Sequence, residues 1–201
     1  MYQVEDLGMA LDQKEFHEDC LFQSMDFSSH NIDDHSFEGC HFKGCRFQDM
    51  KLTGTTFRNC LFQECQLLLL KMYDVVLNEV EFRDCKLMGI NFTDCNSYSF
   101  EPEFRNSSMS HMIFSNMIFR KAVITSCRLE DSDFTDCDLR ESNFTKTEFK
   151  KVMFHHCKLD KADFREASSY SINPESNSIR NARFNLPEAE SFLGFLNILI
   201  E

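Results

Sequence analysis

Residues 40–65 read CHFKGCRFQDMKLTGTTFRNCLFQEC, and a large apolar residue returns in this stretch at every fifth place. Phe42, Phe47, Leu52, Phe57 and Phe62 hold these places, and cysteine often stands two residues earlier. A β-strand alternates its faces every two residues, and an α-helix returns to one face about every 3.6 residues. Neither element explains a period of five, so a larger repeating unit sets it.

The period of five extends over most of the chain. Counting in fives from Phe22 to Phe92 gives fifteen centres, and counting from Phe104 to Phe164 gives thirteen more, all of them large and apolar. The step between the two runs is twelve residues (104 − 92), two more than two repeats. The sequence therefore predicts one regular structure that is interrupted once.

The cysteines follow the same period. All ten fall at the small position of the period, which for nine of them lies two residues before a centre, while the tenth, Cys95, keeps the period at the start of the interruption. They are Cys20, Cys40, Cys45, Cys60, Cys65, Cys85, Cys95, Cys127, Cys137 and Cys157. Alanine, serine, threonine and valine share this position, which indicates that cysteine serves there as a small, soft hydrophobic residue. Cysteine pairs 20 residues apart occur five times and pairs 15 apart only once. The spacing favours four repeats in each coil over three.

Inward residues that repeat at a fixed short period, with polar residues between them, are typical of a solenoid whose coils bury a common core. The segments CDLRESNFTKTEF (137–149) and KADFRE (161–166) resemble the consensus of the pentapeptide-repeat family: a small residue, Asp or Asn, then Leu or Phe. That resemblance implies an all-β fold, a right-handed parallel quadrilateral β-helix. We expect it over residues 20–167, interrupted at about 96–103, after an N-terminal cap segment at 1–19.

Composition and charge exclude several classes of protein. The 201 residues carry a net charge of −12, of which residues 1–50, with 3 Lys+Arg and 11 Asp+Glu, supply −8. A general nucleic-acid binder would be basic, so direct nucleic-acid binding is disfavoured and a partner with a basic groove is favoured. The N-terminus has no signal-peptide pattern, and no apolar run reaches the roughly 20 residues of a membrane span. We expect a cytoplasmic protein with no membrane contact.

Catalytic and metal chemistry find little support in the sequence. No phosphate loop, nucleophile elbow or HExxH motif is present, so we expect no enzymatic activity and no cofactor. Cysteine pairs could be metal or redox sites, but in a solenoid their thiols point into the core, and packed, reduced thiols are the favoured interpretation. His17, His30 and His35 could bind zinc, or they fill the first coil beneath a cap.

The interruption NSYSFEPEF (96–104) is one candidate for a partner contact. It holds the two extra residues and two aromatic residues outside the main pattern, Tyr98 and Phe100, with Glu101 and Glu103 beside them. A tolerated surface insertion explains such a segment equally well. If the segment binds a partner, these four residues are the predicted contacts.

A second candidate lies in LFQECQLLLLKMYDVV (61–76). The register places Leu68, Leu69, Tyr73 and Val76 outward, where solvent favours polar groups. Such a cluster either binds a partner or packs beneath the N-terminal segment.

After residue 167 the repeat fades, and residues 168–201 form a predicted C-terminal cap. Pro187 and Glu188 suit the first turn of a short capping helix. An apolar end follows, and its surplus apolar face predicts a homodimer in which two tails meet. The predicted dimer contacts are Phe192, Phe195, Leu196, Ile198, Leu199 and Ile200.

The tail also narrows the resemblance. INPESNSI (172–179) and NLPEAESFLGFLNILI (185–200) resemble the C-termini of the Qnr quinolone-resistance proteins and of the microcin-immunity protein McbG. That resemblance implies a non-catalytic, DNA-mimicking dimer that binds a type II topoisomerase, DNA gyrase or topoisomerase IV, and protects it from a toxin or a quinolone-type drug. The alternative is a pentapeptide-repeat scaffold or effector that binds an unrelated protein.

Overall fold

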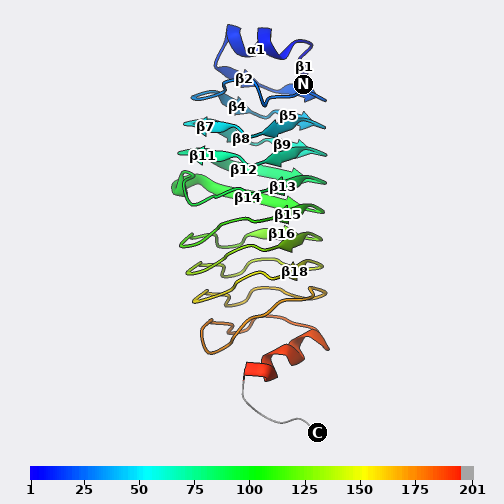
Figure 1. The fold of residues 1–201 in the computed structure, drawn as a ribbon, viewed down its shortest axis with the longest axis vertical. Coiled ribbons are helices and arrows are strands. Elements are labelled where there is room, and N and C mark those ends of the chain that lie inside the picture. Colours follow the sequence, from blue (N-terminus) through cyan, green and yellow to red (C-terminus); the bar gives the residue numbers. More distant parts are fainter. Residues whose placement is uncertain (196–201) are drawn as a thin grey trace.

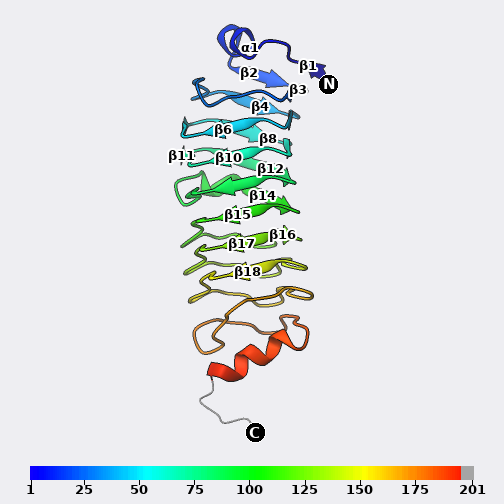
Figure 2. The ribbon, with the colours of Figure 1, turned by 45° about the vertical axis from the view of Figure 1, so that its right-hand side comes forward.

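A computed structural model describes residues 1–195 of the chain, which form a rod of stacked coils (Figures 1 and 2). Its helices are α1 (Leu7–Gln13) and the 3₁₀-helices η1 (Ser97–Ser99) and η2 (Glu188–Phe195). Its strands are β1 (Tyr2–Gln3), β2 (Phe16–Glu18), β3 (Cys20–Gln23), β4 (Ser36–Glu38), β5 (His41–Lys43), β6 (Arg46–Gln48), β7 (Lys51–Thr53), β8 (Thr56–Arg58), β9 (Leu61–Gln63), β10 (Gln66–Leu68), β11 (Lys71–Tyr73), β12 (Val76–Arg83), β13 (Lys86–Met88), β14 (Phe100–Arg105), β15 (Ser108–Ser110), β16 (Val123–Thr125), β17 (Arg128–Glu130) and β18 (Glu148–Lys150).

Every strand pair is parallel, and the register confirms four repeats in each coil. Phe42 pairs with Phe62, Leu67 with Leu87, and Met72 with Leu52, each 20 residues apart. The chain is thus the predicted right-handed, four-sided parallel β-helix. The first face holds β2, β4, β8 and the starts of β12 and β14, and the second holds β1, β3, β5, β9, the ends of β12 and β14, and β16. The third holds β6, β10, β13, β15, β17 and β18, and the fourth holds β7 and β11.

The core is the predicted column of large residues. All 28 centres from Phe22 to Phe164 are buried, and phenylalanines of successive coils stack face to face. The rings of Phe114 and Phe134, for example, lie 4.6 Å apart at an interplanar angle of 1°. Rings of neighbouring faces meet edge-on, as Phe42 and Phe47 do at 69°. Both arrangements suit the charge distribution of an aromatic ring, so one residue type can fill the whole core.

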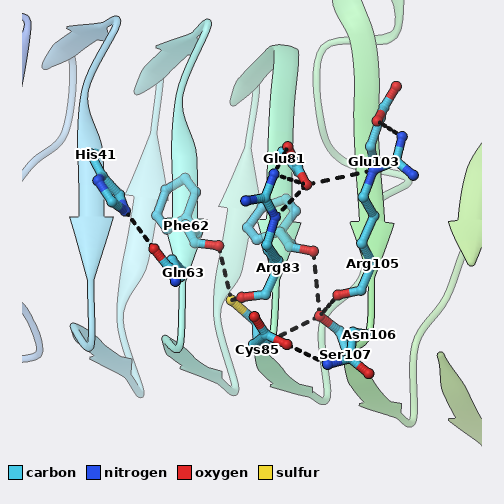
Figure 3. A network of polar contacts seen from close by, with 12 residues as sticks. His41, Phe62, Gln63, Glu81, Arg83, Cys85, Glu103, Arg105, Asn106 and Ser107 are labelled. Atoms are coloured by element: carbon cyan, nitrogen blue, oxygen red, sulfur yellow. Dashed lines mark hydrogen bonds and ion pairs between the residues drawn. The ribbon is translucent and has the colours of Figure 1, made fainter. Parts of the chain in front are cut away.

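The ten cysteines are buried and free, as predicted. Many thiols donate to a backbone carbonyl of the coil above, as Cys85 Sγ does to the Phe62 oxygen at 3.2 Å (Figure 3). Serine and threonine hydroxyls make the same bond from the same position, and Ser107 is one of them. This shared geometry explains why cysteine, serine and threonine alternate there.

The corners use left-handed backbone. At most corners the residue just before the small inward position has a positive φ, about 50–67°. Glycine adopts this conformation freely, while Asp and Asn tolerate it because their side chains bond locally. At Gly39 a Cβ atom would lie 2.6 Å from Oδ1 of Asp19 in the coil above, so a larger residue there would displace the Asp19 carboxylate.

The ladder continues past the predicted limits of 20 and 167. At the N-terminal end, β2 pairs with β4 so that His17 lies beside Phe37, and α1 covers this first coil with Leu7 and Leu11 buried. At the other end, Asp163 pairs with Arg183 and the ring of Phe164 stacks on that of Phe184. The short C-terminal helix, η2, follows Pro187 as predicted. Within residues 1–195 no helix has the length and apolar character needed to cross a membrane.

Candidate protein interface

The interruption forms a loop at the corner before the first face, three residues longer than a regular repeat, and the next corner is one residue shorter, which leaves the net two extra residues. The Asn96 side chain accepts a hydrogen bond from the Tyr98 backbone N–H and starts the short helix η1. The Tyr98 side chain is 96% exposed, so it projects from the rod as predicted. Figure 1 shows this loop as a bulge in the otherwise regular outline, beside β14.

Phe100 does not project with Tyr98, and its predicted role as a surface contact is wrong. It is buried, and its ring meets that of Phe92 at 5.5 Å and that of Phe119 at 4.9 Å, both edge-on. Phe100 pairs with Leu77 in the coil above, so it occupies the first-face centre of its own coil. The irregular spacing hid this role, because Phe100 is eight residues after Phe92 instead of five.

Strand β14 then cuts the corner between the first and second faces. In β12 three steps lead from Leu77 to Val80, whereas in β14 two steps lead from Phe100 to Pro102, so the register shifts by one residue. The coil above turns this corner at Glu79, with φ 52°, and the coil below turns it at Lys121, with φ 56°. Because β14 is straight here, its corner is recessed between the two neighbouring corners.

The recess is a hollow of about 420 Å³, which we call the corner notch. Its floor is apolar and its rim is charged, with four carboxylates above and beside it and two cations below. The lining residues are Glu79, Val80, Glu81, Phe100, Glu101, Pro102, Glu103, Phe119, Arg120, Lys121 and Val123. Sequence reasoning named Glu101 and Glu103 but gave no sign of the notch.

Ion pairs hold part of this rim in place. Glu81 binds Arg83 at 2.8 Å and Arg105 at 3.5 Å, and Glu103 binds Arg105 at 2.6 Å (Figure 3). Arg120 points to Asp138 of the next coil, at 2.8 Å. Asp138 is nearly buried, and its hydrogen bonds to Arg140 and Arg120 hold its pKa far below the usual range. Glu81, Glu103 and Arg120 thus already have partners of opposite charge at the rod surface.

The predicted patch from Leu68 to Val76 does not form one surface. Leu68 lies on the third face in β10, Tyr73 on the fourth in β11, and Val76 on the first in β12. Leu69 and Tyr73 are 46% and 43% exposed, and Leu68 and Val76 are half-buried. The N-terminal segment does not cover them, because β1 pairs with β3 at the far end of the rod. Packing beneath that segment is therefore excluded.

An exposed apolar residue that the sequence reasoning missed lies on the first face. Ile118 is 72% exposed and stands one residue before the buried Phe119, in the coil that follows the loop. Its outward position could have been found from the register, since it lies one place before a centre. Tyr98 and Ile118 lie at the beginning of the first face in two successive coils, and the corner notch lies at the end of that face.

The C-terminal residues divide between the cap and the undescribed end. Phe192 packs edge-on against Phe184 at 4.7 Å and also contacts Tyr170, so it belongs to the cap of its own chain. Phe195 lines an open hollow beside Met153 and His155. The other predicted dimer contacts, Leu196, Ile198, Leu199 and Ile200, lie outside the described residues.

The buried thiols and histidines have shifted acidity but form no metal cluster within residues 1–195. Burial raises the pKa of Cys95 to about 12 and that of Cys127 to about 11. Burial, together with His35 and Lys14, lowers the pKa of His17 to about 4. His17 and His35 bond to each other, while His30 does not join them. A thiol with a raised pKa is a poor nucleophile and a poor metal ligand at neutral pH.

Comparison with known proteins agrees with this architecture. The model of the family described as "pentapeptide repeat region" matches residues 35–100 and 99–164. Two trypsin-treated forms of QnrB1, a plasmid-mediated fluoroquinolone resistance protein, share the fold at 18% identity, with TM-scores of 0.64 and 0.65. In both, 92% of this chain is covered, with 89% and 90% of QnrB1. Full-length QnrB1 gives a TM-score of 0.54 at 14% identity, over 91% of this chain and all of that one. No curated protein sequence matches the chain. With the family model covering well over half of it and the 20-residue coil repeated along its length, this chain belongs to the pentapeptide-repeat family.

Proposed function

We propose that this protein is a non-catalytic DNA mimic that binds a type II topoisomerase, DNA gyrase or topoisomerase IV, and protects it from a toxin or a quinolone-type drug. The observation that carries the proposal is a straight, continuous rod with a net negative charge whose acidic side chains are repeated coil by coil. Its fold is shared with a fluoroquinolone resistance protein, and its tail resembles those of Qnr and McbG.

Length and charge fit a partial imitation of a duplex. The 28 repeats make seven coils, which at roughly 4.8 Å for each coil span about 34 Å. Duplex DNA of that length carries roughly 20 negative charges. The chain has a net charge of −12, and residues 1–50 hold −8 of it. The strongest attraction for a basic groove therefore comes from the N-terminal end of the rod.

A homodimer joined through the C-terminal tails would place these acidic ends far apart. The apolar end of the chain supports this arrangement, because η2 already caps the core and Leu193 remains exposed. Two rods end to end would double the length offered to a DNA-binding groove. In this proposed function the protein acts in the cytoplasm, requires no cofactor, and binds neither nucleic acid nor membrane directly.

A supercoiling assay tests the proposal. Purified gyrase is given relaxed plasmid and a fluoroquinolone at a concentration that traps cleaved DNA, and the protein is added in increasing amounts. We expect fewer cleaved complexes and recovery of supercoiled product. If cleavage stays unchanged at a large molar excess and no complex with gyrase or topoisomerase IV forms on gel filtration, the proposal is wrong.

A scaffold or effector for another protein is the second candidate, and one observation favours it. Tyr98 and Ile118 place apolar side chains on the first face, where a copy of a phosphate backbone would need none. A complex with gyrase or topoisomerase IV would count against this second function, which expects another protein to bind these two side chains.

A further inference from the structure

We infer that the corner notch receives a lysine or arginine side chain from the protein partner, and that Tyr98 and Ile118 hold an apolar neighbour of that residue on the same face. The identity of the partner rests on the proposed function. The location of the contact and its chemistry rest on the geometry of β12, β14 and the coil below.

The notch exists because the backbone ladder is interrupted there. β14 pairs with β12 above it from Phe100 onward, but its pairing with β16 below begins only at Glu103 and Val123. The rings of Phe100 and Phe119 close the gap from inside. A regular coil would place a corner residue in this space. The loop before the first face is three residues longer than a regular repeat, and β14 is one residue shorter at the notch, which leaves a net excess of two.

The floor suits the aliphatic part of a long basic side chain. Val80, Pro102, Phe100 and Phe119 are all buried residues, and the edges they turn toward the notch are apolar. Lysine and arginine cover such surfaces with their methylene groups while the charged head stays at the rim. The volume of about 420 Å³ also allows the head group to keep part of its hydration.

The rim has the opposite charge. The four lining carboxylates outnumber the two lining cations, and Arg120 is already bound to Asp138. Glu81 and Glu103 are paired with arginines of the second face. Glu79 and Glu101 are exposed and form no ion pair among the described residues, and Glu101 accepts only a hydrogen bond from the Asn78 side chain at 2.7 Å. These two carboxylates face an incoming cation across an apolar floor.

The neighbouring apolar side chains extend the contact. Val76, Tyr98 and Ile118 stand at the beginning of the first face in three successive coils, and the notch stands at its end. An aromatic residue at 96% exposure gives a large contact area for little loss of side-chain entropy when it binds. The surface thus suits a segment with an apolar residue followed by a basic one.

The first test measures binding of gyrase to the full-length protein. The variant Glu79→Gln/Glu101→Gln is compared with Glu64→Gln/Glu175→Gln, which removes two other exposed carboxylates distant in sequence and outside the notch lining. We expect the notch variant to bind about tenfold more weakly and the control to stay within about twofold. Tyr98→Ser/Ile118→Ser should weaken binding to a similar extent. All residues concerned are exposed, so thermal unfolding should not change.

The second test does not need gyrase. The peptide acetyl-Leu-Gly-Arg-amide is titrated into the isotope-labelled protein, and backbone amide shifts are recorded for the wild type and for the Glu79→Gln/Glu101→Gln variant. We expect saturable shifts at residues 79–81, 100–103 and 119–121, which are lost in the variant and absent when citrulline replaces arginine.

The outcomes separate the two proposals. If the wild type binds gyrase, the notch variant binds equally well, and the peptide shifts lie elsewhere, the notch inference is wrong while the proposed function stands. If gyrase does not bind but the peptide maps to the notch, the proposed function fails and the notch remains a site for basic side chains of another partner.

Discussion

His17 Nε2 lies 3.2 Å from His35 Nδ1, and the two imidazole rings are stacked at an interplanar angle of 9°. A single proton can serve this contact, because one nitrogen must donate and the other must accept. His17 also stacks on Phe37 at 4.7 Å, so it takes the place that phenylalanine holds in most coils. The first coil is thereby built around a neutral histidine pair beneath α1.

Acidification should destabilise this first coil. Burial, His35 and Lys14 lower the pKa of His17 to about 4, whereas an exposed histidine titrates near 6.5. As the pH falls, His17 is protonated in the unfolded chain before it is protonated in the folded chain. The contribution of neutral, buried His17 to the free energy of unfolding is therefore complete above pH 6.5 and is lost as the pH falls toward 4. The loss amounts to at most about 3 kcal/mol. Burial also lowers the pKa of His35, while Glu15, Asp33 and Asp34 oppose that shift.

Hydrogen exchange at residues 1–40 measures this effect between pH 7 and 4.5. His17→Phe/His35→Val restores the residue types of the coils below and should remove the pH dependence of protection in α1. Equal pH dependence in the variant and the wild type would contradict the assignment to the histidine pair.

Replacing a phenylalanine in the middle of the core should lower the free energy of unfolding far more than replacing the corner residue beside it. Phe134 stacks on Phe114 at 4.6 Å and on Phe154 at 5.3 Å, so Phe134→Ala leaves a cavity in a continuous stack and should cost about 3–5 kcal/mol. Asp136 is exposed and bonds only weakly to His156 at 3.4 Å, so Asp136→Asn, which tolerates the positive φ, should change stability by less than about 0.5 kcal/mol. Urea unfolding of both variants checks this. Similar losses would contradict the register.

The thiols should be unreactive in the folded protein. All ten are buried, which keeps a reagent away from every sulfur, and burial also raises the pKa of Cys95 to about 12 and that of Cys127 to about 11, so these two stay protonated at neutral pH. A thiol reagent at pH 7.5 should label almost none of them until denaturant is added, when all ten should react. Rapid labelling of most cysteines in native buffer would show that the core is open.

Removing residues 196–201 should separate the proposed dimer without opening the core. Phe192 remains to cover Tyr170 and Phe184, so the melting temperature of the shortened chain should stay close to that of the full chain. Sedimentation should find monomers, and protection of gyrase should require much higher protein concentrations. A shortened chain that is still dimeric, or that protects as well as the full chain, would refute the end-to-end arrangement.

Added salt should weaken the complex with topoisomerase. The charges proposed for contact lie on the rod surface, where ions screen them over about 10 Å at 0.1 M. Affinity measured at increasing potassium chloride should fall steadily, and Asp19→Asn/Glu38→Gln near the acidic end should reduce both the affinity and its salt dependence. Affinity that does not respond to salt would favour the apolar scaffold function.

The sequence predicts most of this fold because each coil repeats one packing problem. A centre such as Phe134 meets the same neighbours as Phe114, so a period of five is enough to place it. The same count could have extended the core to His17 and Phe184, which lie five residues before Phe22 and 20 after Phe164. A polar histidine and a weaker pattern concealed these two positions.

The corner notch was harder to predict, because it depends on where the chain takes up the extra residues. Sequence spacing alone does not decide whether Phe100 or a neighbour enters the core. Once Phe100 does so, only three residues lie between it and Phe104, one fewer than in a regular repeat, and β14 has to run straight. The notch forms because β14 has one residue fewer at this corner than the coil above. The conformational preferences of Glu101 and Pro102 do not indicate this difference.

The loop at 96–99 leaves the angular phase of the rod unchanged. Phe82 still lies above Phe104, although the two are 22 residues apart and not 20. Losing or gaining one whole coil would likewise change the length of the molecule and leave every later side chain on its own face, whereas a change of five residues would turn everything downstream by a quarter revolution. The length of the rod and the arrangement of side chains on its faces can therefore vary separately in this architecture. Evolution could add or remove whole coils to fit a longer or shorter groove while each remaining side chain keeps its face.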